Sequence, residues 1–301
     1  MKNNIGKIRK RKDNIAGWAF VSLYVIGLVW MTAYPFIMSF YYAFTDYNIF
    51  KSDVTWVGFD NFVRMFTEDA KFWVSLKVTL KFAFIQVPIK LAFSLMVAMI
   101  LSKATKLVGF YRVAFYIPSL LGGGVAVAIT WKQIWGNNGA INSLLRNLGF
   151  EGYNWLTSPD TALYVLILLG VWAFGSQMLI FLAALKNVPQ ELHEAAILDG
   201  ATAKQRFFKV TLPMLTPALF FNLIQSIIGC LQAFNSSYLI SGGKPLNTTL
   251  YYALHQYNKA FVDHEMGYAS AMAWFLMLII LGFTALTFKS SSAWVYYQSE
   301  D

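Results

Sequence analysis

The sequence predicts an all-α protein that crosses a membrane six times. Of its 301 residues, 57% are hydrophobic and only 13% are charged, which is about half the charged share of soluble domains. The mean hydropathy is +0.50. A helix needs about 20 mostly apolar residues to cross a bilayer. Runs of this kind fall at about residues 16–44, 73–101, 112–134, 162–185, 214–240 and 266–288.

The first apolar run follows a strongly basic stretch, residues 1–15. Its basic residues are Lys2, Lys7, Arg9, Lys10, Arg11 and Lys12. Such a stretch could begin a signal peptide, but the apolar run after it is too long and shows no small-residue cleavage site. We therefore expect a retained first span, with residues 1–15 forming a basic arm in the cytoplasm.

The remaining basic residues orient the other spans. With the N-terminus inside, 14 of the 24 Lys and Arg residues fall in inside segments, 6 fall in outside segments and 4 fall within spans. Cytoplasmic loops carry an excess of Lys and Arg. We therefore expect a transmembrane domain over residues 16–288, both termini in the cytoplasm and a cytoplasmic tail over residues 289–301. No separate soluble domain is predicted.

Helix-breaking residues interrupt two of the predicted spans. Pro35 lies in the first, and Pro118 and the triplet Gly122-Gly123-Gly124 lie in the third. Breaks of this kind are tolerated in membranes where neighbouring helices or water satisfy the freed backbone groups. They often line cavities, although a plain kink is an equally good explanation for any one of them.

The sequence gives no support to enzymatic or metal chemistry. The single cysteine, Cys230, excludes an internal disulfide and a Cys-rich zinc site. His193, His255 and His264 have no metal-ligand spacing, and neither HExxH nor a phosphate-binding loop is present. The net charge of +9 follows the membrane orientation, so no nucleic-acid partner is expected.

Residues 186–213 form a charged loop between the fourth and fifth predicted spans. Pro189 favours the first turn of a helix, and Gly200 is suited to ending that helix. Thr202 and Gln205 have the spacing of a capping box at the start of a second helix. The result is a helix–turn–helix elbow. A docking surface, an amphipathic element on the bilayer and an ordinary structured loop all remain open for it.

The residues of this elbow resemble a family motif. "EAA" at Glu194–Ala196, Gly200 four residues later and "VTLP" ending at Pro213 are similar to the EAA motif of ABC importer permeases. Val210 in place of isoleucine is the one departure. "FYRVAFYIPSLLGGGVAVAITWKQIW" and "LIFLAALKNVPQEL" also resemble landmarks of the carbohydrate-uptake subclass, which includes the maltose and glycerol-3-phosphate permeases.

This resemblance implies a type I ABC importer permease domain with the MetI-like fold, in the cell membrane. The chain would be a non-catalytic subunit of a binding-protein-dependent importer, with a sugar, and more specifically an oligosaccharide, as its substrate. Implied partners are a second homologous permease, an extracytoplasmic solute-binding protein and a cytoplasmic ABC ATPase dimer. ATP and Mg would bind that ATPase, so no cofactor is expected on this chain.

The resemblance also implies a role for the elbow. It would be the coupling helix that seats in a cleft of the ATPase. The residues implied in this coupling are Glu194, Ala195, Ala196, Asp199, Gly200 and Pro213.

Polar and aromatic residues in the fourth and fifth predicted spans are the candidates for the substrate path. Polar groups within a membrane are costly unless they are paired or face a cavity, and sugars need both hydrogen bonds and flat apolar surfaces. The candidates are Trp172, Ser176, Gln177, Asn222, Gln225, Gln232 and Asn235. By resemblance to maltose-type members, Gln232 is the strongest of them. The alternative is that these amides hold helices together.

An ion-coupled secondary transporter or channel is the second hypothesis. Paired acidic residues within spans would favour it, and none of the six predicted spans contains Asp or Glu. A membrane scaffold is a third hypothesis, but it would leave the elbow and the amide-rich spans unexplained. Lys90 is the one deep cation, and unmatched positive charge in a cavity would favour an acidic or phosphorylated ligand. Snorkelling or a contact with a partner permease are the alternatives for Lys90.

Overall fold

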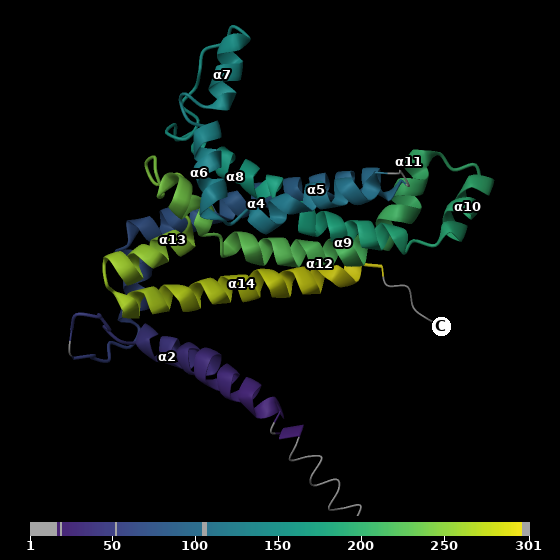
Figure 1. The fold of residues 1–301 in the computed structure, drawn as a ribbon. Coiled ribbons are helices and arrows are strands. Elements are labelled where there is room, and N and C mark those ends of the chain that lie inside the picture. Colours follow the sequence, from purple (N-terminus) through teal and green to yellow (C-terminus); the bar gives the residue numbers. More distant parts are fainter. Residues whose placement is uncertain (1–16, 19, 52, 104–106, 297–301) are drawn as a thin grey trace, which may run out of the picture. The chain divides into compact units, whose positions relative to one another are not determined.

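A computed structural model describes residues 17, 18, 20–51, 53–103 and 107–296, and these form helices joined by turns (Figure 1). The elements in chain order are η1 Val29–Ala33, α2 Tyr34–Ala43, α3 Asp60–Thr67, α4 Ala70–Ser102, α5 Val108–Leu121, α6 Val125–Ile134, α7 Ala140–Asn147, α8 Ala162–Trp172, α9 Gly175–Lys186, α10 Gln190–Leu198, α11 Ala203–Arg206, η2 Phe207–Thr211, α12 Leu212–Leu231, η3 Ser237–Ser241, α13 Tyr252–Tyr257, η4 Asn258–Val262 and α14 Met266–Trp294, where η marks a π-helical turn. Within the described residues, extended pairing is limited to the isolated bridge between Thr45 and Trp56.

Four continuous helices in the described residues are long and apolar enough to cross a membrane. They are Phe20–Ala43, Ala70–Ser102, Ala203–Leu231 and Met266–Trp294. Two bent pairs, α5 with α6 and α8 with α9, also qualify, so the number of spans rises to six if each pair is one span. The all-α, multi-span class predicted from composition is confirmed. The predicted arm, residues 1–15, lies outside the described residues.

Two of the predicted spans differ from the observed helices in shape. The run 112–134, in which the sequence placed helix-breaking residues, is sharply bent, because α5 and α6 meet at an angle of 100°. Gly124 is extended at the bend, with φ −81° and ψ 149°. A Cβ on Gly122 would lie 3.0 Å from the Cβ of Ala173. The glycines therefore let the bend pack closely against the break between α8 and α9, whose axes differ by 43°.

The predicted fifth span, 214–240, is wrong at both ends. α12 ends at Leu231, and non-helical residues separate it from η3. At its start the helix is continuous from Ala203, so Pro213 lies inside a helix and does not mark a break between the elbow and the fifth span. Proline has no N–H to donate. The wider turn η2 precedes it, where the N–H of Leu212 bonds to the carbonyl of Phe207.

The chain divides into two units. The first comprises residues up to Met65 together with Asn258–Phe275, and the second comprises Phe66–Tyr257 together with Leu276–Asp301. In the first unit Phe36 and Phe40 both pack on Trp274, with ring centroids 4.7 Å apart in each case. This aromatic cluster joins α2 to the beginning of α14.

An ion cluster in the first unit joins α3 to η4 and to the segment after η4. Arg64 donates to Glu265 at 2.9 Å, and Lys259 lies 2.9 Å from Asp263 and 3.2 Å from Glu265. Burial alone would lower the pKa of Lys259, but the two carboxylates raise that pKa above its usual value. The cluster therefore keeps Lys259 charged.

The second unit is built around α4, which packs against α8, α9 and α12. Asp69 caps α4 by accepting the backbone N–H groups of Lys71 and Phe72 at 3.0 and 3.1 Å. Its other carboxylate oxygen lies 2.7 Å from Nε2 of the buried His255, which joins α13 to the beginning of α4. α4 thus has a fixed start and presents a continuous face to three neighbours.

Candidate functional site

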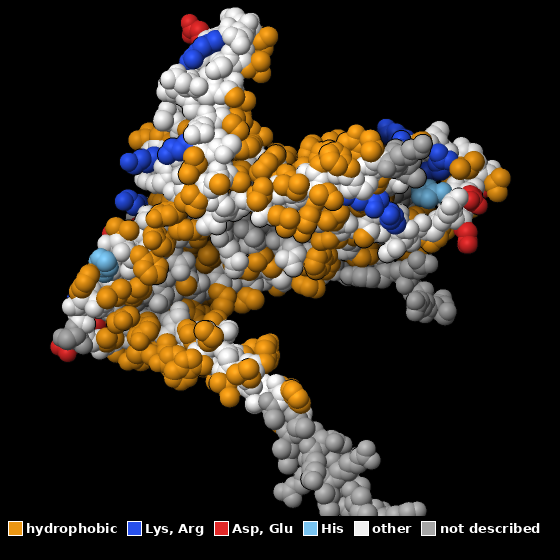
Figure 2. All heavy atoms as spheres, viewed as in Figure 1, with side chains coloured by type: hydrophobic (Ala, Val, Ile, Leu, Met, Phe, Trp, Pro, Cys, Tyr) orange, Lys and Arg blue, Asp and Glu red, His pale blue; other side chains and the backbone are white. Residues whose placement is uncertain are grey.

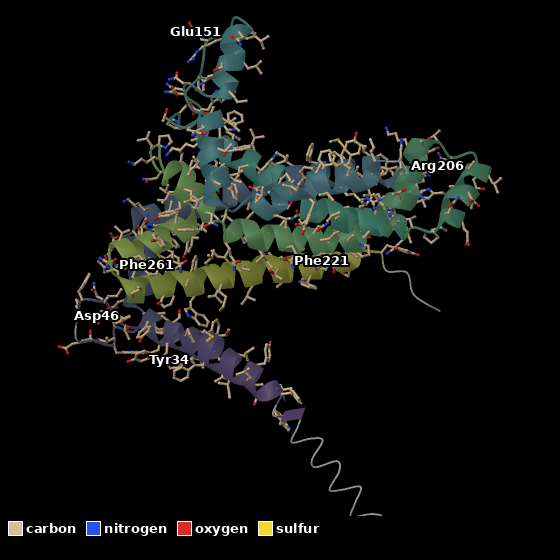
Figure 3. The ribbon with its side chains drawn as sticks, in the orientation of Figure 1. Tyr34, Asp46, Glu151, Arg206, Phe221 and Phe261 are labelled. Carbon is tan, nitrogen blue, oxygen red and sulfur yellow. The ribbon has the colours of Figure 1, made fainter. Side chains whose placement is uncertain are left out.

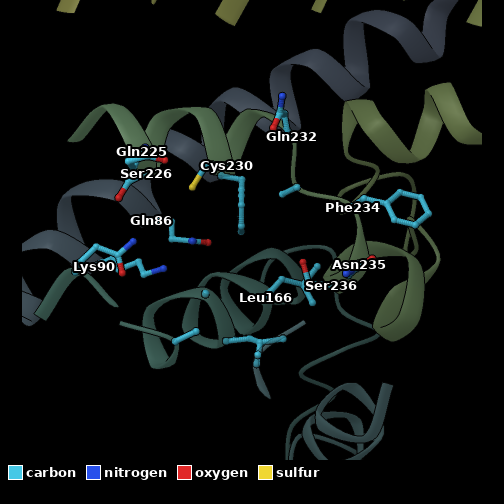
Figure 4. A pocket seen from close by; sticks show the side chains of 18 residues that line it. Gln86, Lys90, Leu166, Gln225, Ser226, Cys230, Gln232, Phe234, Asn235 and Ser236 are labelled. Carbon is cyan, nitrogen blue, oxygen red and sulfur yellow. The ribbon is translucent and has the colours of Figure 1, made fainter. Parts of the chain in front are cut away.

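A polar cavity of about 460 Å³ lies within the second unit, among α4, α8, α9, α12 and the segment after α12. α4 contributes Phe82, Gln86 and Lys90, whose i, i+4 spacing places them on one helix face. The other lining residues are Gly122, Leu166, Leu169, Gly170, Ala173, Gln177, Gln225, Ser226, Gly229, Cys230, Gln232, Ala233, Phe234, Asn235 and Ser236. Figure 4 shows Lys90, Gln86, Gln225 and Ser226 toward one end and Phe234, Asn235 and Ser236 toward the other.

The breaks in the helices create this cavity. Ala173 lies at the break between α8 and α9, and Gln232 lies directly after the last residue of α12. Irregular backbone at membrane depth is tolerated where it is buried in protein or lines a cavity. Gly170 widens the space further, because a Cβ there would overlap the side-chain amide of Gln86. The lack of a side chain at Gly170 therefore allows the Gln86 amide to lie against α8.

Three polar atoms around the cavity have unmet hydrogen-bonding capacity. Gln86 Oε1, Gln177 Oε1 and Ser226 Oγ are buried and have no hydrogen-bond partner among the described residues. Buried polar atoms in folded proteins are nearly always hydrogen-bonded. Water or the hydroxyl groups of a ligand could form the missing hydrogen bonds, so these atoms suit a polar, uncharged ligand surface.

Lys90 is the one charged residue that lines the cavity. No carboxylate is present in the lining, and no salt bridge to Lys90 is found within the described part of the chain. The cavity therefore combines polar and apolar surfaces and carries a single positive charge toward one end.

The predicted substrate-path residues divide into two groups. Gln177, Gln225, Gln232 and Asn235 line the cavity, whereas Trp172, Ser176 and Asn222 do not. Gln232 and Asn235 lie after the end of α12 and not within a span. Contact between any of these residues and a substrate stays a prediction.

The three residues outside the lining have other neighbours. Asn222 is fully buried, and its Nδ2 donates to the carbonyl of Gln177 at 3.3 Å, so it joins α12 to α9. The N–H of Ser176 donates to Ser119 Oγ at 3.2 Å, which joins α9 to α5. The ring of Trp172 lies 5.9 Å from that of Trp131. The side-chain contact of Asn222 fits the helix-holding alternative, whereas the bond at Ser176 is made by its backbone and assigns no role to its hydroxyl group.

Sequence reasoning missed Gln86, Ser226 and Ser236 as lining residues. Gln86 could have been found, because it is the one amide in the predicted second span and lies four residues before Lys90. Ser226 follows Gln225 directly, but a serine within an apolar helix is too common to mark a cavity. Ser236 follows the break after α12, which was itself not predicted.

The elbow is the second candidate site. α10 ends in a Schellman motif: the N–H of Ala201 bonds to the carbonyl of Ala196, and the N–H of Gly200 bonds to that of Ile197, both at 2.9 Å. Gly200 has φ +74°, which is the left-handed conformation predicted for it. Pro189 precedes α10 as its N-cap, one position earlier than predicted.

The predicted capping box at the second helix of the elbow is confirmed. Thr202 Oγ1 accepts from the N–H of Gln205 at 3.3 Å, and Gln205 Oε1 accepts from the N–H of Thr202 at 2.8 Å. A hollow of about 360 Å³ lies inside the elbow, and Asp199 and Arg206 are among its lining residues. Arg206 is labelled there in Figure 3, and Figure 2 shows charged side chains of both signs gathered at this end.

The exposed tip of the elbow is apolar. Leu198 is 88% exposed and Ile197 is 54% exposed, and both lie at the end of α10. Glu194 is hydrogen-bonded to Gln190 at 2.9 Å on the preceding turn. Five of the six predicted coupling residues thus lie on α10 or at the capped turn that ends it, namely Glu194, Ala195, Ala196, Asp199 and Gly200. Pro213 lies apart from them, inside the helix that follows. Their contact with another protein stays a prediction.

A family model of the "binding-protein-dependent transport system inner membrane component" matches residues 76–291. The chain belongs to this family of ABC transporter permeases. The permease is 49% identical over 294 residues to the probable ABC transporter permease protein YesP of Bacillus subtilis, covering 97% of this chain and 95% of that protein. Its resemblance to importer permeases is therefore confirmed.

Two further relatives match over nearly their full lengths. The permease is 32% identical to AmyD of Thermoanaerobacterium thermosulfurigenes, a probable starch degradation products transport system permease, with coverage of 89% and 91%. It is also 32% identical to AraP of Bacillus subtilis, an arabinooligosaccharides transport system permease, with coverage of 92% and 89%.

A solved structure shows the same fold. A chain of a bacterial alginate ABC transporter, in complex with an alginate pentasaccharide-bound periplasmic protein, matches the permease with a TM-score of 0.79 at 20% identity. The match covers 94% of the permease and 96% of that chain. The type I ABC importer permease fold expected from the sequence is therefore confirmed. The permease is a non-catalytic, multi-pass component of the membrane.

Proposed function

We propose that this permease forms half of the pathway of an ATP-driven, binding-protein-dependent importer of oligosaccharides. The observation that carries the proposal is the cavity of about 460 Å³, whose lining includes both unpaired amide and hydroxyl groups and the aromatic rings of Phe82 and Phe234. Sugars present hydroxyl groups at their edges and apolar faces on their rings, and this lining offers partners for both. The names of the relatives AmyD and AraP support an oligosaccharide.

The family and the elbow indicate which partners the permease would have in this importer. A second homologous permease would complete the pathway, and a solute-binding protein would deliver the sugar from outside. A cytoplasmic ABC ATPase dimer, which binds ATP and Mg, would seat the elbow through Leu198 and the neighbouring turn. Both termini of the permease and the elbow would then face the cytoplasm, as the basic residues predict.

One helix joins the two candidate sites. Ala203–Leu231 runs from the elbow to the cavity, and Arg206 near its start lines the elbow hollow while Ser226 and Cys230 near its end line the cavity. A helix of this length spans roughly 44 Å. Movement of the elbow by a closing ATPase would therefore be transmitted directly to one wall of the cavity. The cavity would then have two conformations, one for each state of the ATPase. A ligand that binds one of these conformations better than the other would be released when the ATPase changes state.

Reconstitution of the complete transporter tests this function. Vesicles that contain both permeases and the ATPase should transport oligosaccharides only under two conditions. ATP must be present on the side of the membrane that carries the ATPase, and the binding protein must be present on the other side. Omission of either the ATPase or the binding protein should reduce uptake to background. Uptake by this chain alone, driven by an ion gradient, would instead select the secondary-transporter hypothesis.

A further inference from the structure

The position of Lys90 gives the cavity a defined charge. It lies on α4 one turn after Gln86 and two turns after Phe82, and all three line the cavity. Its neighbours across the cavity include the amide and hydroxyl groups of Gln225 and Ser226 (Figure 4). Intramembrane ionisable residues normally face a cavity and pair with another charge. The cavity supplies Lys90 with polar surroundings but no opposite charge.

The described residues around the cavity offer Lys90 no counter-ion. The lining contains no Asp or Glu, and the described part of α4, α8, α9 and α12 contains none either. A charge taken from water without a partner is costly, and that cost is recovered when an opposite charge binds with good geometry. A negatively charged group on the ligand would provide this partner.

The remaining lining residues limit the kind of anion. Gln86, Gln177 and Ser226 each leave a polar atom unpaired, which suits the hydroxyl groups of a sugar. Phe234, toward the other end, is stacked on Tyr238 with ring centroids 5.0 Å apart and offers a flat apolar surface. A phosphate dianion would leave a second negative charge unmatched, because Lys90 is the one cation of the lining. A sugar carboxylate carries a single charge.

We propose that the cavity accepts an acidic oligosaccharide, one carboxylate of which pairs with Lys90 while its hydroxyl groups bind the amides beside it. This inference rests on the proposed import of oligosaccharides and names their chemical class. A charge-assisted hydrogen bond between an ammonium group and a carboxylate is about twice as strong as a neutral one, so Lys90 would favour uronate-containing sugars over neutral sugars of the same size.

A matched pair of sugar pools tests the inference in the complete transporter. The first pool is a partial hydrolysate of polygalacturonate and alginate, and the second is the same hydrolysate after chemical reduction of its carboxyl groups to neutral alcohols. Both are offered together to vesicles with the binding protein and ATP, and the accumulated sugars are identified by mass spectrometry. The wild-type transporter should accumulate members of the acidic pool in preference to their neutral counterparts.

Substitutions of Lys90 give the second part of the test. Lys90→Gln should lower accumulation of the acidic sugars by at least about tenfold and thereby abolish the preference. Lys90→Arg, which keeps the positive charge, should retain the preference for acidic sugars. Lys77→Gln removes an exposed lysine of the same helix outside the cavity and should change nothing.

Each other result has a distinct meaning. Equal accumulation of acidic and neutral sugars by the wild type, or acidic uptake unaltered by Lys90→Gln, would overturn the inference and leave oligosaccharide import standing. If Lys90→Gln lowered the uptake of acidic and neutral sugars equally, Lys90 would have a structural role, and this result would also overturn the inference. Uptake of no sugar from either pool would count against the proposed function itself.

Discussion

Gly200→Val is expected to lower ATP-driven uptake by at least about tenfold while the protein remains in the membrane. Gly200 has φ +74°, and nothing lies within 4 Å of a Cβ built there, so the obstacle is the backbone conformation and not the space. A left-handed residue other than glycine costs roughly 1–2 kcal/mol, and each 1.4 kcal/mol is a factor of ten. The substitution should open the Schellman turn and displace Leu198, through which we propose that the elbow contacts the ATPase.

Gly200→Asn is the matched control for this prediction. Asparagine visits the left-handed conformation more readily than other residues, so the turn and the uptake should largely survive. Initial rates of uptake, ATP hydrolysis and the amount of protein in the membrane should be measured for both variants. Normal uptake by Gly200→Val, at an unchanged amount of protein, would show that the shape of this turn is not needed for coupling.

Gly229→Trp is expected to reduce uptake to background without loss of the complex. Gly229 lines the cavity, and nothing lies within 4 Å of a Cβ built at this position, so a larger side chain can enter the open space without displacing backbone. An indole ring there would occupy much of the volume that the substrate needs. Because the elbow is unaltered, binding of the ATPase should persist in this variant.

Gly229→Ala provides the comparison. A methyl group in open space at a helical position should be tolerated, and alanine favours the helix by roughly 0.5–1 kcal/mol over glycine. Uptake should therefore stay close to that of the unaltered transporter. Wild-type transport by Gly229→Trp would exclude this cavity from the substrate path, and loss of ATPase binding would mean that the tryptophan disturbs the fold.

The parts of the structure that depend on local chemistry were predictable from the sequence. The capping box of Thr202 and Gln205 and the left-handed turn at Gly200 follow from the residues themselves. The composition and the length of the apolar runs likewise predicted a helical protein of several spans. In these cases the nearest neighbours along the chain decide the backbone conformation.

The shapes of the third and fifth predicted spans could not be predicted in the same way. The bend at Gly122 depends on the close approach of Ala173, about 50 residues away, and no local pattern shows this contact. α12 ends at Leu231, and the mostly polar residues 232–237 follow it; the predicted fifth span extended across them to the apolar residues 238–240. As a result the sequence identified Gln177, Gln225, Gln232 and Asn235 but gave no reason to separate them from Asn222, which is buried between helices.

The central claim is that the elbow engages an ATPase on the cytoplasmic side and drives the cavity. Its most direct test replaces Cys230, the one cysteine of the chain, with alanine and adds Leu198→Cys at the exposed tip of the elbow. A maleimide-linked photo-crosslinker attached there in the assembled transporter should join the permease to the ATPase, and an impermeant maleimide should label it only from the cytoplasmic side. Labelling only from the outside, or an assembled complex in which no adduct with the ATPase forms, would contradict the account.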